Sequence, residues 1–95
     1  MDVQILPMQA ADVPQVAELE KACFSDPWPE SVLSNELENE LSLWLVAKNG
    51  DTVLGYIGSQ SVLDEADMMN IAVRKDARRQ GIAKKLILAL CARLH

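Results

Sequence analysis

A basic stretch near the end of the 95-residue chain carries the side chains best suited to bind an anion. Six Lys and Arg residues flank one glycine, Gly81: Arg74, Lys75, Arg78, Arg79, Lys84 and Lys85. Before them, Asn70–Val73 reads as a short apolar strand, and Gly81–Leu94 reads as a helix. A loop from a strand into a helix points backbone N–H groups at one place, and the helix dipole favours negative charge there. The stretch therefore predicts a phosphate-binding loop.

This loop differs from the two common nucleotide-binding loops. A Walker loop needs two glycines separated by four residues and then Lys followed by Ser or Thr, whereas no hydroxyl residue follows Lys84 and Lys85 directly. The dinucleotide-binding fingerprint needs three glycines, and this loop contains Gly81 alone. The sequence therefore predicts a phosphate-binding loop that belongs to neither of these two classes.

The charge of the chain is divided unevenly along its length. Residues 1–70 contain two basic and 13 acidic residues, a net charge of −11; residues 71–95 contain seven basic residues and one acidic residue, a net charge of +6, and the total is −5. A basic island on an acidic body suits a small polyphosphate better than a nucleic acid. A helix-turn-helix is also disfavoured, because Asp67–Val73, before the basic turn, reads as a strand. We expect no nucleic-acid partner.

Composition and length narrow the class of protein. We expect residues 1–95 to form a single domain of ordinary globular composition, with an apolar fraction of 49%. His95 is the only histidine, which excludes a Ser-His triad or a histidine-liganded zinc site, and Cys23 and Cys91 read as small buried side chains, so we expect no metal. No run of about 20 apolar residues and no basic N-terminal region is present, which predicts a soluble, cytoplasmic protein without a membrane partner.

Hydrophobic periodicity and turn residues predict seven elements in the order β-α-α-β-β-β-α. Their ranges are a strand at Asp2–Leu6, helices at Ala10–Cys23 and Glu30–Glu38, strands at Leu43–Lys48, 52–63 and Asp67–Val73, and a helix at Gly81–Leu94. Asn49-Gly50 predicts a tight hairpin, and Gly55 and Gly58 predict a bulge or a close backbone approach in the next strand. The order fits an α/β fold in which helices cover both sides of a mixed, mostly antiparallel sheet.

Three segments resemble the GNAT (GCN5-related N-acetyltransferase) family, and most of all its RimI-type ribosomal-protein alanine N-acetyltransferases. They are Arg78-x-x-Gly81-x-Ala83, Cys23-Phe24-x-x-Pro27-Trp28, and Leu63–Ala66 followed by Asn70–Val73. The resemblance covers the N-terminal portion of that family's domain and implies a GNAT-like fold whose C-terminal half lies beyond residue 95. It departs from the family at Pro29, where a helix-capping Ser or Thr is expected.

The resemblance implies that the chain binds acetyl-CoA as a cosubstrate and acetylates a protein N-terminal amine, possibly that of a ribosomal protein. The strand residues that would pair with the pantetheine arm are Ile71, Ala72 and Val73, with a backbone N–H near Val73 polarising the thioester. The residues that would hold the pyrophosphate are Arg78, Arg79, Gln80, Gly81, Ile82, Ala83 and Lys84. Pro27 and Trp28 would line the entry for the acceptor peptide, with Phe24 and Asp26 as weaker candidates; for Trp28, packing of the loop is an equal alternative.

The resemblance leaves the catalytic residues unknown. In the family, the glutamate base and the tyrosine acid follow the helix with which this chain ends. Glu65 and Asp67 read as turn or edge residues, and Tyr56 as a packing residue. The alternative function is a non-catalytic CoA-binding or interaction module. Because Leu86–Ala92 is apolar nearly all round, we also expect self-association through the last helix or the edge of the fourth strand.

Overall fold

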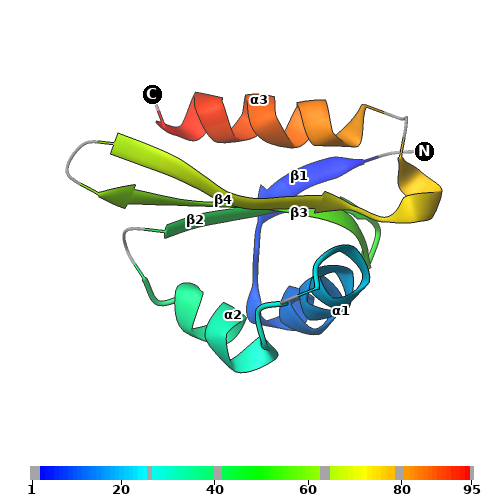
Figure 1. Cartoon of the computed structure of the whole chain (residues 1–95). Coiled ribbons are helices and arrows are strands. Elements are labelled where there is room, and N and C mark those ends of the chain that lie inside the picture. The colour runs from blue at the N-terminus through cyan, green and yellow to red at the C-terminus, as the bar shows by residue number, and fades with distance from the viewer. Residues whose placement is uncertain (1–2, 26, 40–41, 63–64, 79–80, 95) are drawn as a thin grey trace.

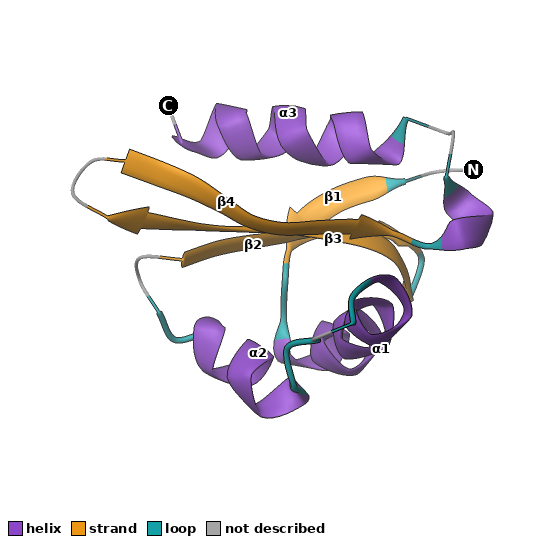
Figure 2. Cartoon of the chain, viewed as in Figure 1, coloured by secondary structure: helices purple, strands orange, loops and turns teal. Residues whose placement is uncertain are grey.

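The computed structural model describes residues 3–25, 27–39, 42–62, 65–78 and 81–94. Its elements are β1 (Gln4–Pro7), α1 (Val13–Cys23), α2 (Glu30–Glu36), β2 (Ser42–Asn49), β3 (Thr52–Val62), β4 (Glu65–Val73) and α3 (Ile82–Leu94), with single 3₁₀ turns η1 (Ala10–Asp12) and η2 (Lys75–Ala77). The four strands form one antiparallel sheet in the order β1-β2-β3-β4. Helices α1 and α2 cover one face and α3 covers the other (Figures 1 and 2). The predicted element order and the layered α/β architecture are confirmed.

Alternation along the strands gives each face of the sheet its own apolar core. On β2, Trp44 and Val46 belong to the core under α1 and α2, whereas Leu45 and Ala47 belong to the core under α3. The α3 core is completed by one stripe of that helix, since Ile82, Leu86 and Leu90 recur every four residues and are buried. The sheet is therefore the middle of three layers, and its last strand, β4, lies at an edge.

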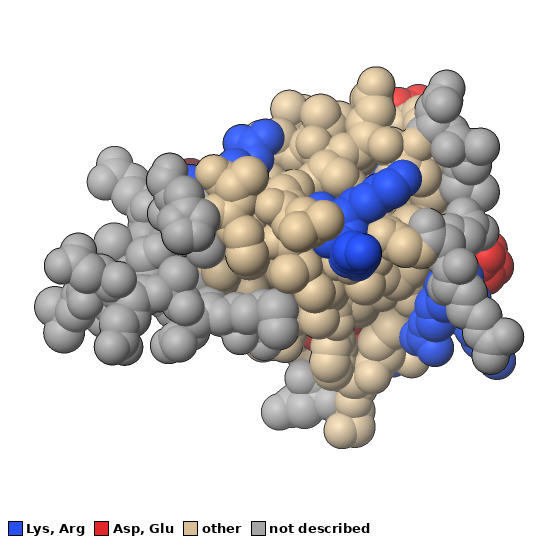
Figure 3. Space-filling view, turned by 90° about the horizontal axis from the view of Figure 1, so that it is seen from above, with Lys and Arg blue, Asp and Glu red and all other residues tan. Residues whose placement is uncertain are grey.

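In the described part of the chain, α3 is buried on one side, and its second apolar stripe is uncovered. Ile87 is 41% exposed and Leu88 is 58% exposed, so the second apolar stripe of α3 faces away from the sheet. Figure 3 views the molecule from the α3 side, where uncharged atoms dominate and the charged side chains near the centre are Lys or Arg. The helix thus buries one stripe on the sheet and leaves an apolar one outside.

Two glycines behave as their positions in the sequence predict. Gly50 adopts a φ of 63° in the tight turn between β2 and β3, which a residue with a side chain rarely does. Gly58 passes under the Trp44 ring so closely that a Cβ atom would lie 2.7 Å from ring carbons. The register between β3 and β4 also shifts beside Gly58, because Asn70 pairs with Gly58 and Met68 with Ser59, which leaves Met69 as an extra residue. The close approach is confirmed at Gly58, and the bulge within β3 itself lies beside Gly55, where pairing steps from Ala47–Gly55 to Lys48–Val53 and leaves Leu54 as the extra residue.

Several predicted boundaries are wrong by two or three residues. The α1 helix begins at Val13, because Ala10–Asp12 forms a 3₁₀ turn in which the Asp12 carboxylate accepts the backbone N–H of Gln9 at 2.9 Å. The second helix ends at Glu36 instead of Glu38, and β4 begins at Glu65, which pairs with Val62. Pro29 is the N-cap residue of α2 and makes no side-chain cap, because its ring has no atom that can accept a hydrogen bond.

Candidate functional site

The edge of β4 exposes hydrogen-bonding groups of the backbone. The N–H of Arg74 donates to the carbonyl oxygen of Leu54 at 2.7 Å, which fixes the phase of the antiparallel ladder between β3 and β4. In that pattern the backbone N–H and C=O groups of Ala72 bond to those of Tyr56 on β3. The N–H and C=O groups of Ile71 and Val73 therefore point away from β3. They therefore line the edge at which an extended ligand could pair with the strand.

A cavity of about 440 Å³ lies along this edge, between the end of α1 and the start of α3. Seven of the ten residues predicted to bind the cofactor line it: Ile71, Ala72, Val73, Arg78, Gly81, Ile82 and Ala83. Cys23, Phe24 and Ala77 complete the described lining. Lys84 is exposed on α3 but does not line the cavity, and Arg79 and Gln80 lie outside the described residues. The structure thus gathers the strand and the start of the helix at one site.

Gly81 gives the entry to α3 its shape. Its φ of 76° lies in the left-handed region, which a residue with a Cβ atom rarely adopts. The carbonyl oxygen of Gly81 accepts the N–H of Lys85 at 3.0 Å, so the first helical turn starts directly after it. The first N–H groups of a helix have no acceptor within the helix, and Ile82 and Ala83 place theirs beside the cavity. This end of the cavity is therefore suited to an anion.

Arg78 lies between the strand edge and the end of α1. Its Nε donates to the carbonyl oxygen of Val73 at 3.1 Å, from the side opposite β3. Its Nη2 donates to the Cys23 sulfur at 3.6 Å. The guanidinium therefore places a positive charge at the cavity and occupies one of the outward carbonyl groups of β4.

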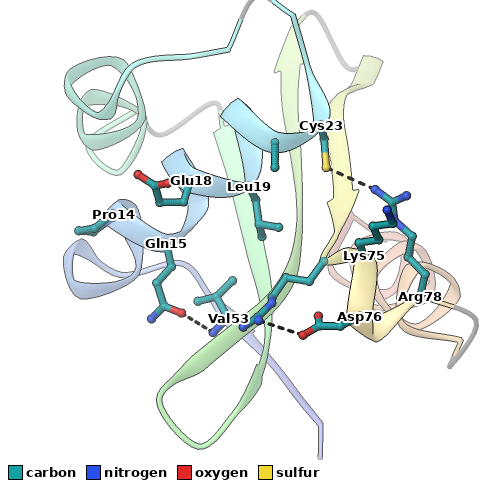
Figure 4. Close-up of a pocket in the computed structure, with 11 residues that line it drawn as sticks. Pro14, Gln15, Glu18, Leu19, Cys23, Val53, Lys75, Asp76 and Arg78 are labelled. Carbon is teal, nitrogen blue, oxygen red and sulfur yellow. Dashed lines mark hydrogen bonds and ion pairs between the residues drawn. The ribbon is translucent and has the colours of Figure 1, made fainter.

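A larger groove, of about 890 Å³, lies on the other side of Arg78, between α1 and the segment that follows β4. Some of its polar side chains already have partners (Figure 4): Gln15 accepts the N–H of Val53 at 2.8 Å, and Asp76 forms an ion pair with Arg74 at 3.0 Å. Of the predicted cofactor residues, Arg78 is the one that lines it in the described part of the chain. The smaller cavity is therefore the candidate site.

The predicted acceptor residues lie away from the β4 edge. Pro27 and Trp28 are partly buried and are not among the residues that line the smaller cavity. The Trp28 ring packs on Trp44, with the ring centroids 5.6 Å apart and the planes tilted by 58°. Of the two weaker candidates, Phe24 lines the cavity, whereas Asp26 lies outside the described residues.

Sequence reasoning missed a buried carboxylate, that of Glu20 on α1. Its Oε1 accepts hydrogen bonds from the Tyr56 hydroxyl and from Nδ2 of Asn70, the latter at 2.7 Å, and its Oε2 accepts the backbone N–H of Trp28 at 3.2 Å. The residue is fully buried. One sequence signal could have found it: Glu20 follows Val16 by four residues and so falls on the apolar face of the helix.

Tyr56 is a buried packing residue, as predicted, and it shares this network. Burial raises the pKa of its hydroxyl far above the ordinary value, and the hydrogen bond to Glu20 and the negative charge of that residue act in the same direction. Its ring stacks on Trp44 with centroids 5.9 Å apart. The side chains of Glu65 and Asp67 lie outside what the structure describes.

The described residues contain neither a membrane-spanning helix nor a cluster of metal ligands. Within the described ranges, every helix falls short of the length and apolar character that crossing a membrane requires. Three or more metal-ligating side chains do not gather anywhere in those ranges.

The chain matches known acetyltransferases in sequence. It is 32% identical over 80 residues to the putative [ribosomal protein bS18]-alanine N-acetyltransferase of Bacillus subtilis, and the match covers 83% of this chain and 53% of that protein. It is 35% identical over 81 residues to the Escherichia coli [ribosomal protein bS18]-alanine N-acetyltransferase, covering 84% of this chain and 53% of the relative. The chain therefore spans about half the length of these curated relatives.

Solved structures show the same fold. The E. coli ribosomal-protein-S18-alanine N-acetyltransferase superimposes with a TM-score of 0.85 at 28% identity, over 98% of this chain and 59% of that one. The PaiA N-acetyltransferase of Thermoplasma acidophilum, solved in complex with coenzyme A, superimposes with a TM-score of 0.84 at 18% identity, over 99% of this chain and 72% of that one, which shows the fold alone. The acetyltransferase (GNAT) family model matches residues 13–95, so the chain belongs to the GNAT family.

Proposed function

We propose that the chain binds acetyl-CoA in the cavity along the β4 edge and forms the cofactor-binding part of a RimI-like N-acetyltransferase. The observation that supports this most is the convergence, in one cavity, of the outward backbone groups of Ile71 and Val73 with the start of α3 at Gly81. An acyl-CoA molecule has an amide-rich arm next to a pyrophosphate, and these two surfaces match its two parts in the same order.

Each predicted cofactor residue has a role in this proposal. Ile71 offers N–H and C=O groups to the pantetheine amides, with Ala72 as the packing residue between the two outward pairs. Val73 has an outward N–H that would polarise the thioester carbonyl. Its carbonyl oxygen already accepts a hydrogen bond from Arg78, so the N–H is the outward group of Val73 that is left for the ligand. The pyrophosphate would be held by the positive charges and N–H groups of the loop and first helical turn: Arg78, Arg79, Gln80, Gly81, Ile82, Ala83 and Lys84.

The acceptor is the N-terminal amine of a protein, with Pro27 and Trp28 forming one wall of its site. Relatives named [ribosomal protein bS18]-alanine N-acetyltransferase favour a ribosomal protein as substrate and, with it, a cytoplasmic location. In the reaction the amine attacks the thioester carbon, the C–S bond breaks, and the thiolate of coenzyme A leaves. A base must take the proton of the amine. No Asp or Glu lines the cavity among the side chains that the structure describes, so we assign no base.

The same observation keeps a second function open, a CoA-binding module that does not catalyse transfer. This module would bind CoA through Ile71–Val73 and Gly81–Lys84 and leave the thioester intact. We further propose that copies of the chain self-associate through the exposed stripe of α3, which includes Ile87 and Leu88, or through the β4 edge. A stable monomer in sedimentation velocity would contradict that association.

Calorimetric titration of the chain with coenzyme A tests the proposal. We expect binding that the Gly81→Asp substitution abolishes, because it adds a side chain and a negative charge at the proposed pyrophosphate site. No binding at millimolar coenzyme A would refute the proposed function. A second assay, with acetyl-CoA and a peptide that begins with alanine, separates the two functions, since acetylation of the peptide by the chain would exclude the non-catalytic module.

A further inference from the structure

We propose that Glu20 is a positioning residue that fixes the acceptor segment Pro27–Trp28 relative to β4, the strand that would bind the pantetheine arm. The inference rests on the proposed function, and it assigns a role to a residue that does not line the cofactor cavity. It starts from one carboxylate that joins three separate segments of the chain.

The two oxygens of Glu20 face in different directions. Oε1 accepts from the sheet, through the Tyr56 hydroxyl on β3 and Nδ2 of Asn70 on β4. Oε2 accepts from the acceptor segment, through the backbone N–H of Trp28 at 3.2 Å. One rigid carboxylate plane therefore connects the proposed acceptor wall to β4.

On the segment side, the backbone offers Glu20 a single N–H donor. Pro27 and Pro29 have no N–H, so Trp28 supplies the only backbone donor of the three-residue stretch. That donor points to Glu20. The ring of the same residue packs on Trp44, so the amide and the ring hold Trp28 from two sides.

The anchor on the strand side lies next to the residues that would bind the cofactor. Asn70 directly precedes Ile71, and it flanks the bulge at Met69 where the register between β3 and β4 shifts. Its side chain is on the α1 side of the sheet, whereas the outward backbone groups of Ile71 lie at the edge. A shift of the Glu20 carboxylate would therefore move the acceptor wall relative to β4 without removing any group that contacts the cofactor.

Because Glu20 is buried, substitutions at this residue can test its hydrogen bonds. The residue is fully buried, and its three donors are neutral, so each of them loses its partner when the carboxylate is removed. Glutamine is the conservative replacement, because its carbonyl oxygen can accept from Trp28 while its amide nitrogen donates one hydrogen to the hydroxyl oxygen of Tyr56 and the other to Oδ1 of Asn70, whose side-chain amide turns over to present that oxygen. Glu18 provides the control, since it lies two residues earlier on α1 with its side chain 76% exposed.

The test compares Glu20→Ala, Glu20→Gln and Glu18→Ala with the wild type in the full chain. Three quantities are measured: hydrogen exchange of the Trp28 amide by NMR, affinity for coenzyme A, and affinity for a bisubstrate analogue in which coenzyme A is joined to the N-terminal alanine of a short peptide. For Glu20→Ala we expect about tenfold faster Trp28 exchange and about tenfold weaker binding of the analogue, the effect of one lost hydrogen bond to a charged group. Affinity for coenzyme A should stay within about twofold, well below the effect of one such bond.

Rescue by the conservative variant distinguishes positioning from general damage. Glu20→Gln and Glu18→Ala should retain slow Trp28 exchange and wild-type affinity for the analogue. Equal losses of coenzyme A and analogue affinity in Glu20→Ala would overturn the inference, as would unchanged Trp28 exchange. If Glu20→Ala does not fold, Asn70→Ala replaces it, because it releases β4 from the same carboxylate by shortening a partly buried side chain; unchanged analogue affinity in that variant would overturn the inference too.

The wild-type measurements separate this inference from the proposed function. A wild type that binds no coenzyme A refutes the proposed function and the inference with it. A wild type that binds coenzyme A as tightly as the analogue refutes only the inference, because the peptide part then makes no contact that Glu20 could position. A wild type that binds the analogue more tightly supports both.

Discussion

The Nη2 atom of Arg78 donates to the sulfur of Cys23 at 3.6 Å, which connects the end of α1 to the segment before α3. The same guanidinium donates through Nε to the carbonyl oxygen of Val73 on β4. The end of α1 thus meets β4 at one arginine, although Cys23 and Arg78 are 55 residues apart in the sequence. Cys23 consequently lines the candidate cofactor cavity with Ile71 and Val73 and is partly exposed, not buried as predicted.

This position predicts that acetyl-CoA protects Cys23 from alkylation. A ligand in the cavity covers the sulfur, so at a ligand concentration ten times the dissociation constant the alkylation rate should fall by about tenfold. Cys91, which is exposed on α3, serves as the control within the same molecule and should react at an unchanged rate. The measurement is iodoacetamide labelling followed by mass spectrometry of the two cysteine peptides. Equal protection of both cysteines, or of neither, would contradict the assignment of the cavity.

Gly81 and Gly50 provide a matched pair for the phosphate loop. Both have positive φ angles, 76° and 63°, and a Cβ atom at either would meet no atom within 4 Å. Replacement by alanine should therefore cost each position about 1 kcal/mol of stability through backbone strain alone. Because Gly81 starts the helix turn at the cavity, Gly81→Ala should also weaken coenzyme A binding by about tenfold, the effect of one lost hydrogen bond to a charged group.

Denaturant unfolding and calorimetry measure the two effects of these glycine substitutions separately. Gly50→Ala should lose the same stability and retain its affinity for coenzyme A. If both variants lose affinity equally, the loss comes from destabilisation, and the loop has no specific role in binding.

The element order was predictable because it depends on local patterns. Apolar alternation and Asn49-Gly50 lie within short windows, and the strands, the β2–β3 turn and the helix after Gly81 occur in the predicted order. For α3, helical periodicity showed which residues are apolar, but it could not show which apolar stripe the sheet covers. Leu88, exposed on this helix, is as apolar in the sequence as the buried Leu86.

The contacts that organise the site could not be predicted, since they join residues distant in the chain. Glu20 and Asn70 are 50 residues apart, and nothing in the local pattern of either residue identifies the other. Asp12 is a similar case, because its carboxylate accepts the N–H of Gln9 at its own 3₁₀ turn and also pairs with Lys48 on β2, 36 residues away.

The pairing of Lys48 with Asp12 leads to a stability prediction. Nζ of Lys48 lies 2.8 Å from Oδ1 of Asp12, and the Asp12 side chain is only 3% exposed. Lys48→Met leaves that carboxylate buried with the Gln9 N–H as its recorded donor, so the cost should lie near the lower end of roughly 3–5 kcal/mol. In the exposed pair of Lys21 with Glu18, Lys21→Met should change stability by no more than about 0.5 kcal/mol. Urea denaturation measures both, and similar costs would contradict the structure.

The raised pKa of Tyr56 predicts how stability changes in alkali. In the unfolded chain the hydroxyl ionises near pH 10, whereas burial first, and then the hydrogen bond and charge of Glu20, raise its pKa in the folded protein. The folded state therefore holds a proton that the unfolded state releases, so the contribution of Tyr56 is complete below about pH 10 and is lost above it by about 1.4 kcal/mol per pH unit. Tyr56→Phe should lack this slope, while the lysines affect both proteins equally. Because Tyr56 is the only tyrosine, tyrosinate absorbance should appear only as the chain unfolds; titration of the folded protein near pH 10 would contradict its burial beside Glu20.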